Sequence, residues 1–227
     1  MSTFDQMIAE ITPHVLLKAY GCGIFPMAES ANDTALYWIE PERRGIIPLD
    51  NIHIPKRLTK TIKQMKFDIR IDHDFHGVID GCSSPHAGRK STWINARIRE
   101  LYHELFKLGY CHTIEAWQDD KLVGGLYGVH LAGVFFGESM FSYKRDASKV
   151  ALTYLLARLK AGNFQLLDTQ FVTDHLRTFG AVEITRDKFQ MLLDESLHYK
   201  ADFFLLPEDA PPLSILHLVN QTSKTGC

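Results

Sequence analysis

The stretch CHTIEAWQDDKLVGGLYGVHLAGVFFGESMFS (residues 111–142) decides the fold of this chain. It contains three β-type runs, with turn signals between them at Gln118–Lys121 and near Ala132–Gly133. Such a pattern predicts three consecutive antiparallel strands, a β-meander. The last run, FFGESMFS (135–142), carries apolar residues on both faces, which is typical of a strand buried on both sides.

Helices and further strands flank the meander. Upstream, the periodicity predicts a helix opening near Pro55, a strand at 67–72, and an amphipathic helix within 91–110 that ends at Gly109. Downstream, it predicts a helix at 146–163, a strand at 164–172, a short helix at 173–181, then the segments 182–186 and 188–199. The residues through Leu49 are rich in turn signals, and the prolines from Pro207 onward predict an irregular tail. This order predicts an α/β (α+β) fold with a mixed sheet covered by helices.

Composition limits the classes of protein. The chain has 227 residues, is 45% hydrophobic and 23% charged, and has a formal net charge of -2, as expected for a globular protein without global attraction to nucleic acid. No apolar run is long enough for a membrane span, and the first 15 residues lack the basic region of a secretory signal. Scattered cysteines predict neither zinc nor disulfides, and fit the cytoplasm. They are Cys22, Cys82, Cys111 and Cys227.

Two polar residues stand out in LLDTQF (166–171). Strand alternation directs Asp168 and Gln170 to the same side, where both need hydrogen-bond partners. One interpretation is a pair that handles a reacting group. The structural alternative is that Asp168 caps a nearby loop.

A carboxylate lies among apolar side chains in FFGESMF (135–141). Simple alternation places Glu138 with Phe136 and Met140, and Phe135 on the opposite face with Ser139. A core strand with a satisfied glutamate is one interpretation. The other is that Met140 and a phenylalanine line an apolar acyl-side-chain pocket with Glu138 at its rim, because methionine adapts to several shapes.

Basic residues form candidate RNA contacts. The helix face Lys56, Arg57, Lys60, Lys63 and Lys66 contains no acid, and Arg89, Lys90, Arg97 and Arg99 could extend it into an RNA-contacting stripe. Trp38, Trp93 and Tyr102 could stack on bases. Lys144, Arg145 and Lys149 lie near a helix start and could bind an anion. A solvated helix face is the alternative explanation.

No motif for a metal or a cofactor is convincing. His73 and His76 in HDFH diverge if a strand runs into a turn there, so we expect no metal site. The chain also lacks a Gly-rich phosphate turn and a GxSxG nucleophile motif, so phosphate binding would rest on side chains.

Several uncommon motifs occur in an order that resembles the leucyl/phenylalanyl-tRNA–protein transferase family. They cover about residues 15–195 and are AYGCGIFPM (19–27), LYWIEPERRGIIPLD (36–50), STWI (91–94), CHTIEAW (111–117), LVGGLYGV (122–129), FFGESMFS (135–142), ASKVAL (147–152), LLDTQF (166–171) and FGA (179–181).

The resemblance implies a small N-terminal domain, residues 1–52, packed on a GNAT-like mixed-sheet C-terminal domain, residues 53–227. It implies transfer of leucine, phenylalanine or, less well, methionine from aminoacyl-tRNA to the N-terminal arginine or lysine of a protein, which marks that protein for degradation. The partners would be aminoacyl-tRNA and such proteins, with no cofactor, metal or membrane.

The resemblance also carries over site residues by motif. Asp168 and Gln170 match the pair that handles the incoming amine, and Glu138 matches a third polar residue. The expected substrate-binding residues are Phe135, Met140, Trp38, Trp93, Tyr102 and Ser139, and the expected tRNA-binding residues are Lys56, Arg57, Lys60, Lys63, Arg89, Lys90, Lys144 and Arg145. Departures from the family pattern are Met27, Thr169, Leu126 and Leu155, the last two of which bear on side-chain preference.

Few groups are needed for this chemistry. An aminoacyl ester is already activated, and an α-amine with a pKa of about 8 is partly uncharged at neutral pH. Positioning supplies most of the remaining catalysis. Asp168 and Gln170 could orient the amine and accept its proton, or the 2′-hydroxyl of the tRNA could shuttle it. Glu138 could fix this network or meet the basic side chain of the acceptor.

Two other functions are compatible with parts of the sequence. An acyl-CoA-dependent N-acetyltransferase would share the implied fold, but the absent Gly-rich turn opposes it. A non-catalytic RNA-binding module would explain the basic residues but would leave Asp168, Gln170 and the apolar pocket without a role.

Overall fold

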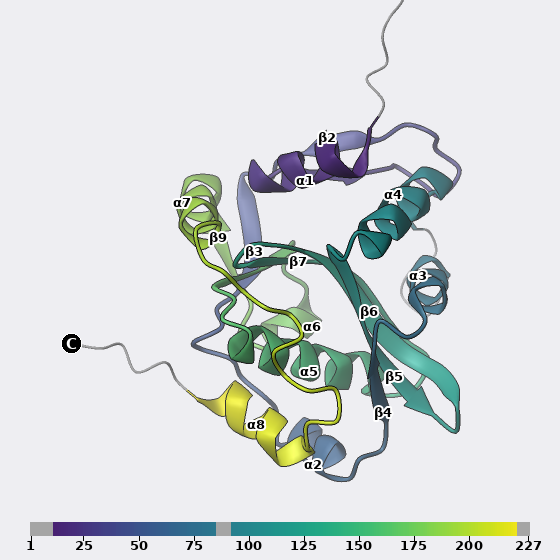
Figure 1. Ribbon diagram of the computed structural model, residues 1–227, viewed down its shortest axis with the longest axis vertical. Coiled ribbons are helices and arrows are strands. Elements are labelled where there is room, and N and C mark those ends of the chain that lie inside the picture. The colour runs from purple at the N-terminus through teal and green to yellow at the C-terminus, as the bar shows by residue number, and fades with distance from the viewer. Residues whose placement is uncertain (1–10, 85–91, 222–227) are drawn as a thin grey trace, which may run out of the picture.

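A seven-stranded mixed sheet forms the centre of the protein (Figure 1). The structure is a computed structural model, and it describes residues 11–84 and 92–221. In sheet order the strands are β4 (Asp68–Ile71), β5 (Cys111–Gln118), β6 (Lys121–Leu131), β7 (Val134–Ser142), β8 (Leu166–Gln170), β3 (Arg43–Ile47) and β9 (Val182–Thr185). Only β7 and β8 pair in parallel, and the other neighbours are antiparallel. The predicted mixed sheet and its meander, β5 to β7, are confirmed.

Helices cover both faces of the sheet and enclose two apolar cores (Figure 1). On one face lie α1 (Pro13–Gly21), α3 (Phe75–Ser83) and α4 (Ala96–Lys107). On the other face α5 (Ala147–Ala161) packs on the meander and is itself covered by α2 (Lys56–Lys63) and α8 (Pro212–Asn220). The chain is completed by α6 (Asp174–Arg177), α7 (Arg186–Ser196), and a separate hairpin of β1 (Phe25–Met27) and β2 (Tyr37–Ile39).

A β-bulge in β7 places Glu138 outside the regular ladder. Across the β6–β7 pair, Tyr127 lies opposite Ser139, but the next residue, Gly128, lies opposite Gly137. Glu138 is therefore the extra residue of the bulge. Bulges of this kind re-aim side chains and often lie beside functional sites.

The bulge also changes which core each neighbour enters. Phe135 belongs to the core on the α5 face and Phe136 to the core on the opposite face. Met140 packs against the same core as Phe135, although their positions differ by an odd number, which in a regular strand would place them on opposite faces. Simple alternation, which placed Met140 with Phe136, is wrong here because one residue has been inserted into the period.

The parallel strands β7 and β8 stay paired for only a short distance. Their register runs from Val134 opposite Leu166 to Phe136 opposite Asp168. Beyond this point the bulge carries β7 away, while β8 ends at Gln170. The two strands therefore separate next to Glu138 of β7 and to Asp168 and Gln170 of β8.

Four helices, α1, α3, α7 and α8, were not predicted. The tail from Pro207 is not wholly irregular, because α8 begins at Pro212. A proline is tolerated in the first turn of a helix, since the N–H that it lacks would have no partner within the helix. The same applies to α1, which has Pro13 in its first turn and Thr12 as its N-cap. After β4 the segment with His73 and His76 enters α3, capped by the Asp74 side chain, instead of an open turn.

The first 52 residues contribute directly to the main sheet. Strand β3 lies between β8 and β9, and α1 packs on α4. The division into domains at residues 52 and 53, and the GNAT-like classification, stay predictions.

The tight packing at the bulge gives a first testable expectation. A Cβ on Gly128 would lie 2.4 Å from a ring carbon of Phe135 and 2.4 Å from the carbonyl oxygen of Phe136. Gly128→Ala should therefore lower the free energy of unfolding by about 2 kcal/mol, as overpacked core substitutions do. The matched control is Gly137→Ala, whose Cβ would meet nothing closer than 3.5 Å. Urea denaturation measures both, and equal losses would contradict this account of the bulge.

Candidate active site

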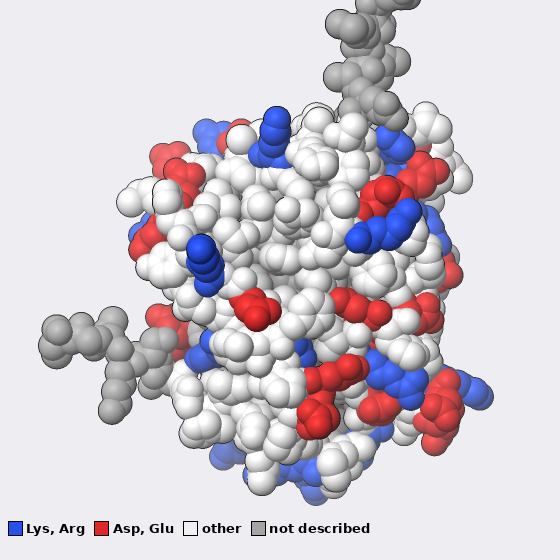
Figure 2. All heavy atoms as spheres, viewed as in Figure 1, with Lys and Arg blue, Asp and Glu red and all other residues white. Residues whose placement is uncertain are grey.

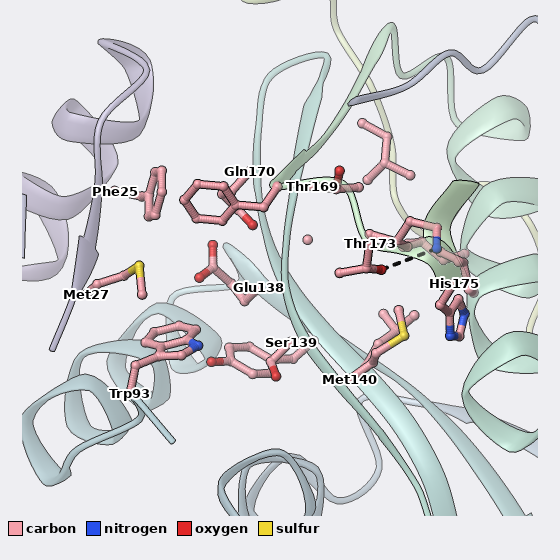
Figure 3. A pocket seen from close by; sticks show the side chains of 18 residues that line it. Phe25, Met27, Trp93, Glu138, Ser139, Met140, Thr169, Gln170, Thr173 and His175 are labelled. Carbon is pink, nitrogen blue, oxygen red and sulfur yellow. Dashed lines mark hydrogen bonds between the residues drawn. The ribbon is translucent and has the colours of Figure 1, made fainter. Parts of the chain in front are cut away.

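A cavity of about 330 Å³ opens where β7 and β8 part (Figure 3). This volume is that of a small-molecule site. In Figure 3, Glu138 and Gln170 lie at one end with Phe25 and Met27 of the hairpin, and Met140, Thr173 and His175 lie at the other. The remaining lining residues are Trp93, Leu126, Tyr127, Gly137, Ser139, Leu152, Leu155, Leu167, Thr169, Phe171 and Leu176. The cavity thus has a polar end and a mostly apolar end.

The apolar end is built by the core itself. Leu152 and Leu155 come from α5, Leu126 from β6 and Leu167 from β8, and all four are buried. Burial, more than the charge of nearby Lys149, lowers the pKa of His175, so this residue adds no charge at neutral pH. Such an end accepts an apolar side chain and rejects a charged one.

Glu138 reaches two buried tyrosines from different helices. The hydroxyl of Tyr20 in α1 donates to Glu138 Oε1 at 2.5 Å, and the hydroxyl of Tyr102 in α4 donates to Oε2 at 2.9 Å. Burial raises the pKa of Glu138 to about 7, although the two tyrosine hydrogen bonds act in the opposite direction. Burial also raises the pKa of both tyrosines well above the usual value, so they remain donors.

The number of protons in this cluster favours the protonated acid. The hydroxyls of Tyr20 and Tyr102 are also 2.5 Å from each other, so the three groups form a ring of three contacts. With Glu138 ionised, the two phenols supply only two protons. With Glu138 protonated, each contact can hold one proton, and the ring is complete. The site therefore has a carboxyl group poised to gain or lose a proton near neutral pH.

Asp168 lies behind the wall of the cavity and does not line it. It is fully buried, and Arg44 of β3 donates to both of its oxygens, from Nε to Oδ1 at 2.9 Å and from Nη2 to Oδ2 at 2.7 Å. The backbone N–H of Gln170 also donates to Oδ1, at 2.9 Å. Asp168 thus fixes the chain at Gln170, as the structural alternative from the sequence expected.

Gln170 turns away from Asp168 and into the cavity. Its φ of +55° is in the left-handed region, so strand alternation no longer applies, and the two side chains do not share a face. Its side-chain Nε2 is buried and has no hydrogen-bond partner within the described residues. An unpaired buried amide is costly, which makes it a ready donor for a bound ligand.

The other predicted substrate-binding residues divide into two groups. Met140, Ser139 and Trp93 line the cavity, as expected. Phe135 does not, because it precedes the bulge and stacks on Phe203 in the core, with ring centroids 5.7 Å apart. Tyr102 is too buried to stack on a base, and its hydroxyl donates to Glu138 instead.

Trp38 lies beside the cavity without lining it. It lies opposite Pro26 in the β1–β2 hairpin, next to Met27 of the cavity wall, and it is 41% exposed. An exposed indole in this place is available to stack on a base.

The predicted tRNA-binding residues that the structure describes lie along α2 and just before α5. Lys56, Arg57, Lys60 and Lys63 lie on α2, and in Figure 2 Lys and Arg atoms gather along the lower edge of the molecule, where Figure 1 shows this helix. Arg57 donates to Asp146 at 3.0 Å, so an acid that is distant in sequence interrupts the patch. Lys144 and Arg145 precede α5 and are exposed. Arg89 and Lys90 lie outside the described residues.

Several residues of the site were not predicted. Arg44, Tyr20 and Phe25 fall inside two motifs quoted above, LYWIEPERRGIIPLD and AYGCGIFPM, which was the available signal. His175 had no signal of its own in the sequence.

Within the described ranges, no cluster of three or more histidine, cysteine, aspartate or glutamate residues could hold a metal ion. No helix of this part of the chain combines the length and apolarity needed to cross a membrane.

Sequence comparison places this chain among proteins of one kind. The profile of the family described as "Leucyl/phenylalanyl-tRNA protein transferase" matches residues 46–194, and that of its N-terminal domain matches residues 9–42. A leucyl/phenylalanyl-tRNA–protein transferase of Rhodopseudomonas palustris (strain HaA2) is 57% identical over 211 residues, 93% of this chain and 94% of the relative. That of Afipia carboxidovorans is 56% identical over 99% of this chain and all of the relative. That of Nitrobacter winogradskyi is 58% identical over 89% and 90%.

The raised pKa of Glu138 predicts how stability depends on pH. Between about pH 4.5, its ordinary pKa, and about pH 7, the folded protein binds more protons at Glu138 than the unfolded chain does. The free energy of unfolding therefore falls as the pH rises through this window. Relative to Glu138→Gln, the wild type should lose on the order of 2 kcal/mol from pH 4.5 to 7.5. Urea denaturation at both pH values measures this.

The exposed Glu100→Gln serves as the control, because it should leave that pH dependence unchanged. If the free energies of unfolding of the wild type and of Glu138→Gln changed in parallel with pH, the raised pKa of Glu138 would be contradicted.

Proposed function

The chain belongs to the leucyl/phenylalanyl-tRNA–protein transferase family, and we propose that the cavity between β7 and β8 is where it joins its two substrates. It transfers leucine, phenylalanine or, less well, methionine from aminoacyl-tRNA to the N-terminal arginine or lysine of an acceptor protein, which marks that protein for degradation. The observation that carries the site assignment is the two-ended cavity. Its apolar end suits the side chain, and its polar end presents Glu138 and Gln170 to the ester.

Glu138 is the proton acceptor in this proposal. Its carboxylate takes a proton from the α-ammonium group of the acceptor, and a pKa of about 7 suits a base that works at neutral pH. The free amine then attacks the ester carbonyl, the new C–N bond forms, and the bond to the ribose oxygen breaks. That oxygen receives the second proton of the nitrogen, directly or through the ribose 2′-hydroxyl.

Asp168 suits a supporting role better than that of the base. Both its oxygens already accept hydrogen bonds from Arg44, and it does not face the cavity. Gln170, with its free Nε2–H, is placed to donate to the carbonyl oxygen as negative charge develops there. The pair assigned to the amine thus divides into a positioning residue and a donor.

The tRNA is held by side chains. Trp93 in the wall and the exposed Trp38 beside it would stack on the terminal adenosine. The lysines of α2, with Lys144 and Arg145, would contact the phosphates, so binding should weaken with salt. We place the reaction in the cytoplasm, where charged tRNA is available.

The alternatives fit the site less well. An acyl-CoA-dependent N-acetyltransferase needs a backbone cradle for the pyrophosphate, and the sequence has no Gly-rich turn for it. A non-catalytic RNA-binding module leaves a carboxyl group of pKa about 7 at the cavity wall unexplained.

Substitutions at the polar end test the catalytic assignment. With leucyl-tRNA and an Arg-initiated peptide, Glu138→Gln should lower kcat about 100-fold or more, because the base is lost. Gln170→Ala should cost on the order of 100-fold through the lost oxyanion donor, and Asp168→Ala should also impair transfer. The product is the peptide bearing one added leucine, detected by mass spectrometry and lost on RNase treatment.

Wild-type activity should rise with pH through about 7 as Glu138 ionises. Glu100→Gln, at an exposed residue that does not line the cavity, is the activity control. Near-normal turnover in all three site variants would reject the assignment.

The apolar end predicts side-chain selectivity. Met140→Ala removes part of the wall, so phenylalanyl-tRNA should gain over leucyl-tRNA by about tenfold in kcat/KM, the effect of roughly one methylene group in a hydrophobic pocket. Met191→Ala, at an exposed methionine of α7, is the matched control. Competition between the two charged tRNAs measures the ratio, and an unchanged ratio in Met140→Ala would show that the side chain binds elsewhere.

A further inference from the structure

We propose that Arg44 is a positioning residue that holds the two walls of the cavity's polar end at a fixed separation. This inference rests on the proposed function, because it assigns Arg44 a part in the same reaction. It does not touch the cavity and acts through Gln170 on one side and Phe25 on the other.

The guanidinium group of Arg44 is enclosed on every side. It is 1% exposed and lies between two phenyl rings, 4.7 Å from the centroid of Phe25 and 4.4 Å from that of Phe189. Its Nε and Nη2 donate to Asp168, and its Nη1 donates to the carbonyl oxygen of Gly23 at 2.8 Å. One rigid, planar group thus joins β8 to the segment that leads into β1.

The first wall depends on Asp168. Held by Arg44, its Oδ1 accepts from the Gln170 N–H, and Gln170 adopts the left-handed conformation that aims its side chain into the cavity. That conformation is unfavourable for a residue with a Cβ and persists only where neighbouring contacts impose it. The Arg44–Asp168 pair is the contact that imposes it.

The second wall depends on Gly23. This residue has a φ of +78° and directs its carbonyl group toward Arg44, while the chain two residues later forms β1 and places Phe25 in the cavity wall. The Phe25 ring also faces the edge of Phe171, with centroids 6.1 Å apart. Movement of Arg44 would therefore displace both sides of the polar end together.

The backbone of β3 is shaped to bring Arg44 this close. Gly45 lies opposite Gln170, and the register shifts between Gly45 and Ile46. A Cβ at Gly45 would lie 2.8 Å from the backbone of Phe171 and 2.9 Å from Thr169 Oγ1, so only glycine permits the approach of β3 to β8.

Arg44→Lys tests the proposal, because it keeps the charge but cannot make the forked contact. We expect kcat with leucyl-tRNA to fall about 100-fold, since a misplacement of about 1 Å has that effect. The KM for leucyl-tRNA should change less than about threefold, because the apolar end is intact. The rise of activity through about pH 7 should stay in place, because the positive charge near Glu138 is retained.

The matched control is Arg158→Lys in α5. Arg158 is also buried, also lies over a phenyl ring, and donates to the carbonyl oxygens of Phe203 and Leu206, away from the cavity. It should lose stability but keep its kcat. Equal kcat losses in the two variants, or a wild-type kcat in folded Arg44→Lys, would overturn the proposal.

Hydrogen exchange of the Gln170 backbone amide gives a readout independent of activity. It should be slow in the wild type and in Arg158→Lys, and at least tenfold faster in Arg44→Lys. If the Gln170 amide exchanges at the same rate in Arg44→Lys as in the wild type, the role of Arg44 is overturned. If the wild type transfers no leucine but the exchange rates differ as expected, only the proposed function is refuted. If Arg44→Lys does not fold, Asp168→Asn tests the same contact from the other side. We expect its kcat to fall about tenfold or more, and a wild-type kcat would overturn the proposal.

Discussion

The parting of two parallel strands is the constraint on which the rest of the site depends. Strands β7 and β8 pair from Val134 to Phe136 and then separate, because β7 carries an extra residue and β8 ends in a left-handed residue. The separation creates a cavity within a core whose large side chains still line it. Both residues that cause it, Glu138 and Gln170, are also the polar residues at one end of its lining.

Glu138 is a carboxyl group among apolar side chains, and its hydrogen bonds make this position tolerable. A carboxylate among phenylalanines is costly, and the fold neither exposes it fully nor neutralises it with an arginine. Two phenols from helices on the same face of the sheet donate hydrogen bonds to it instead. This arrangement leaves the group able to exchange a proton near neutral pH.

The sequence predicted the regular parts of the structure and could not predict the irregular ones. Alternation identified the meander, and periodicity identified α2, α4 and α5, because these elements follow a single period. It failed at Met140, where one inserted residue shifts the period, and at α8, where the prolines from Pro207 onward were interpreted as an irregular tail. Asp168 was correctly singled out as a residue that needs partners, but its partner Arg44 is distant in sequence, so its role could not be derived.

The position of β3 has a consequence for synthesis on the ribosome. This strand is bordered by β8 and β9, which are made much later during translation, and Gly45 pairs with Gln170. Contacts of such long sequence separation form late in folding. A nascent or truncated chain that lacks β8 and β9 can close neither the sheet nor the cavity. Under the proposed function, a chain that lacks these two strands cannot transfer an amino acid to another protein.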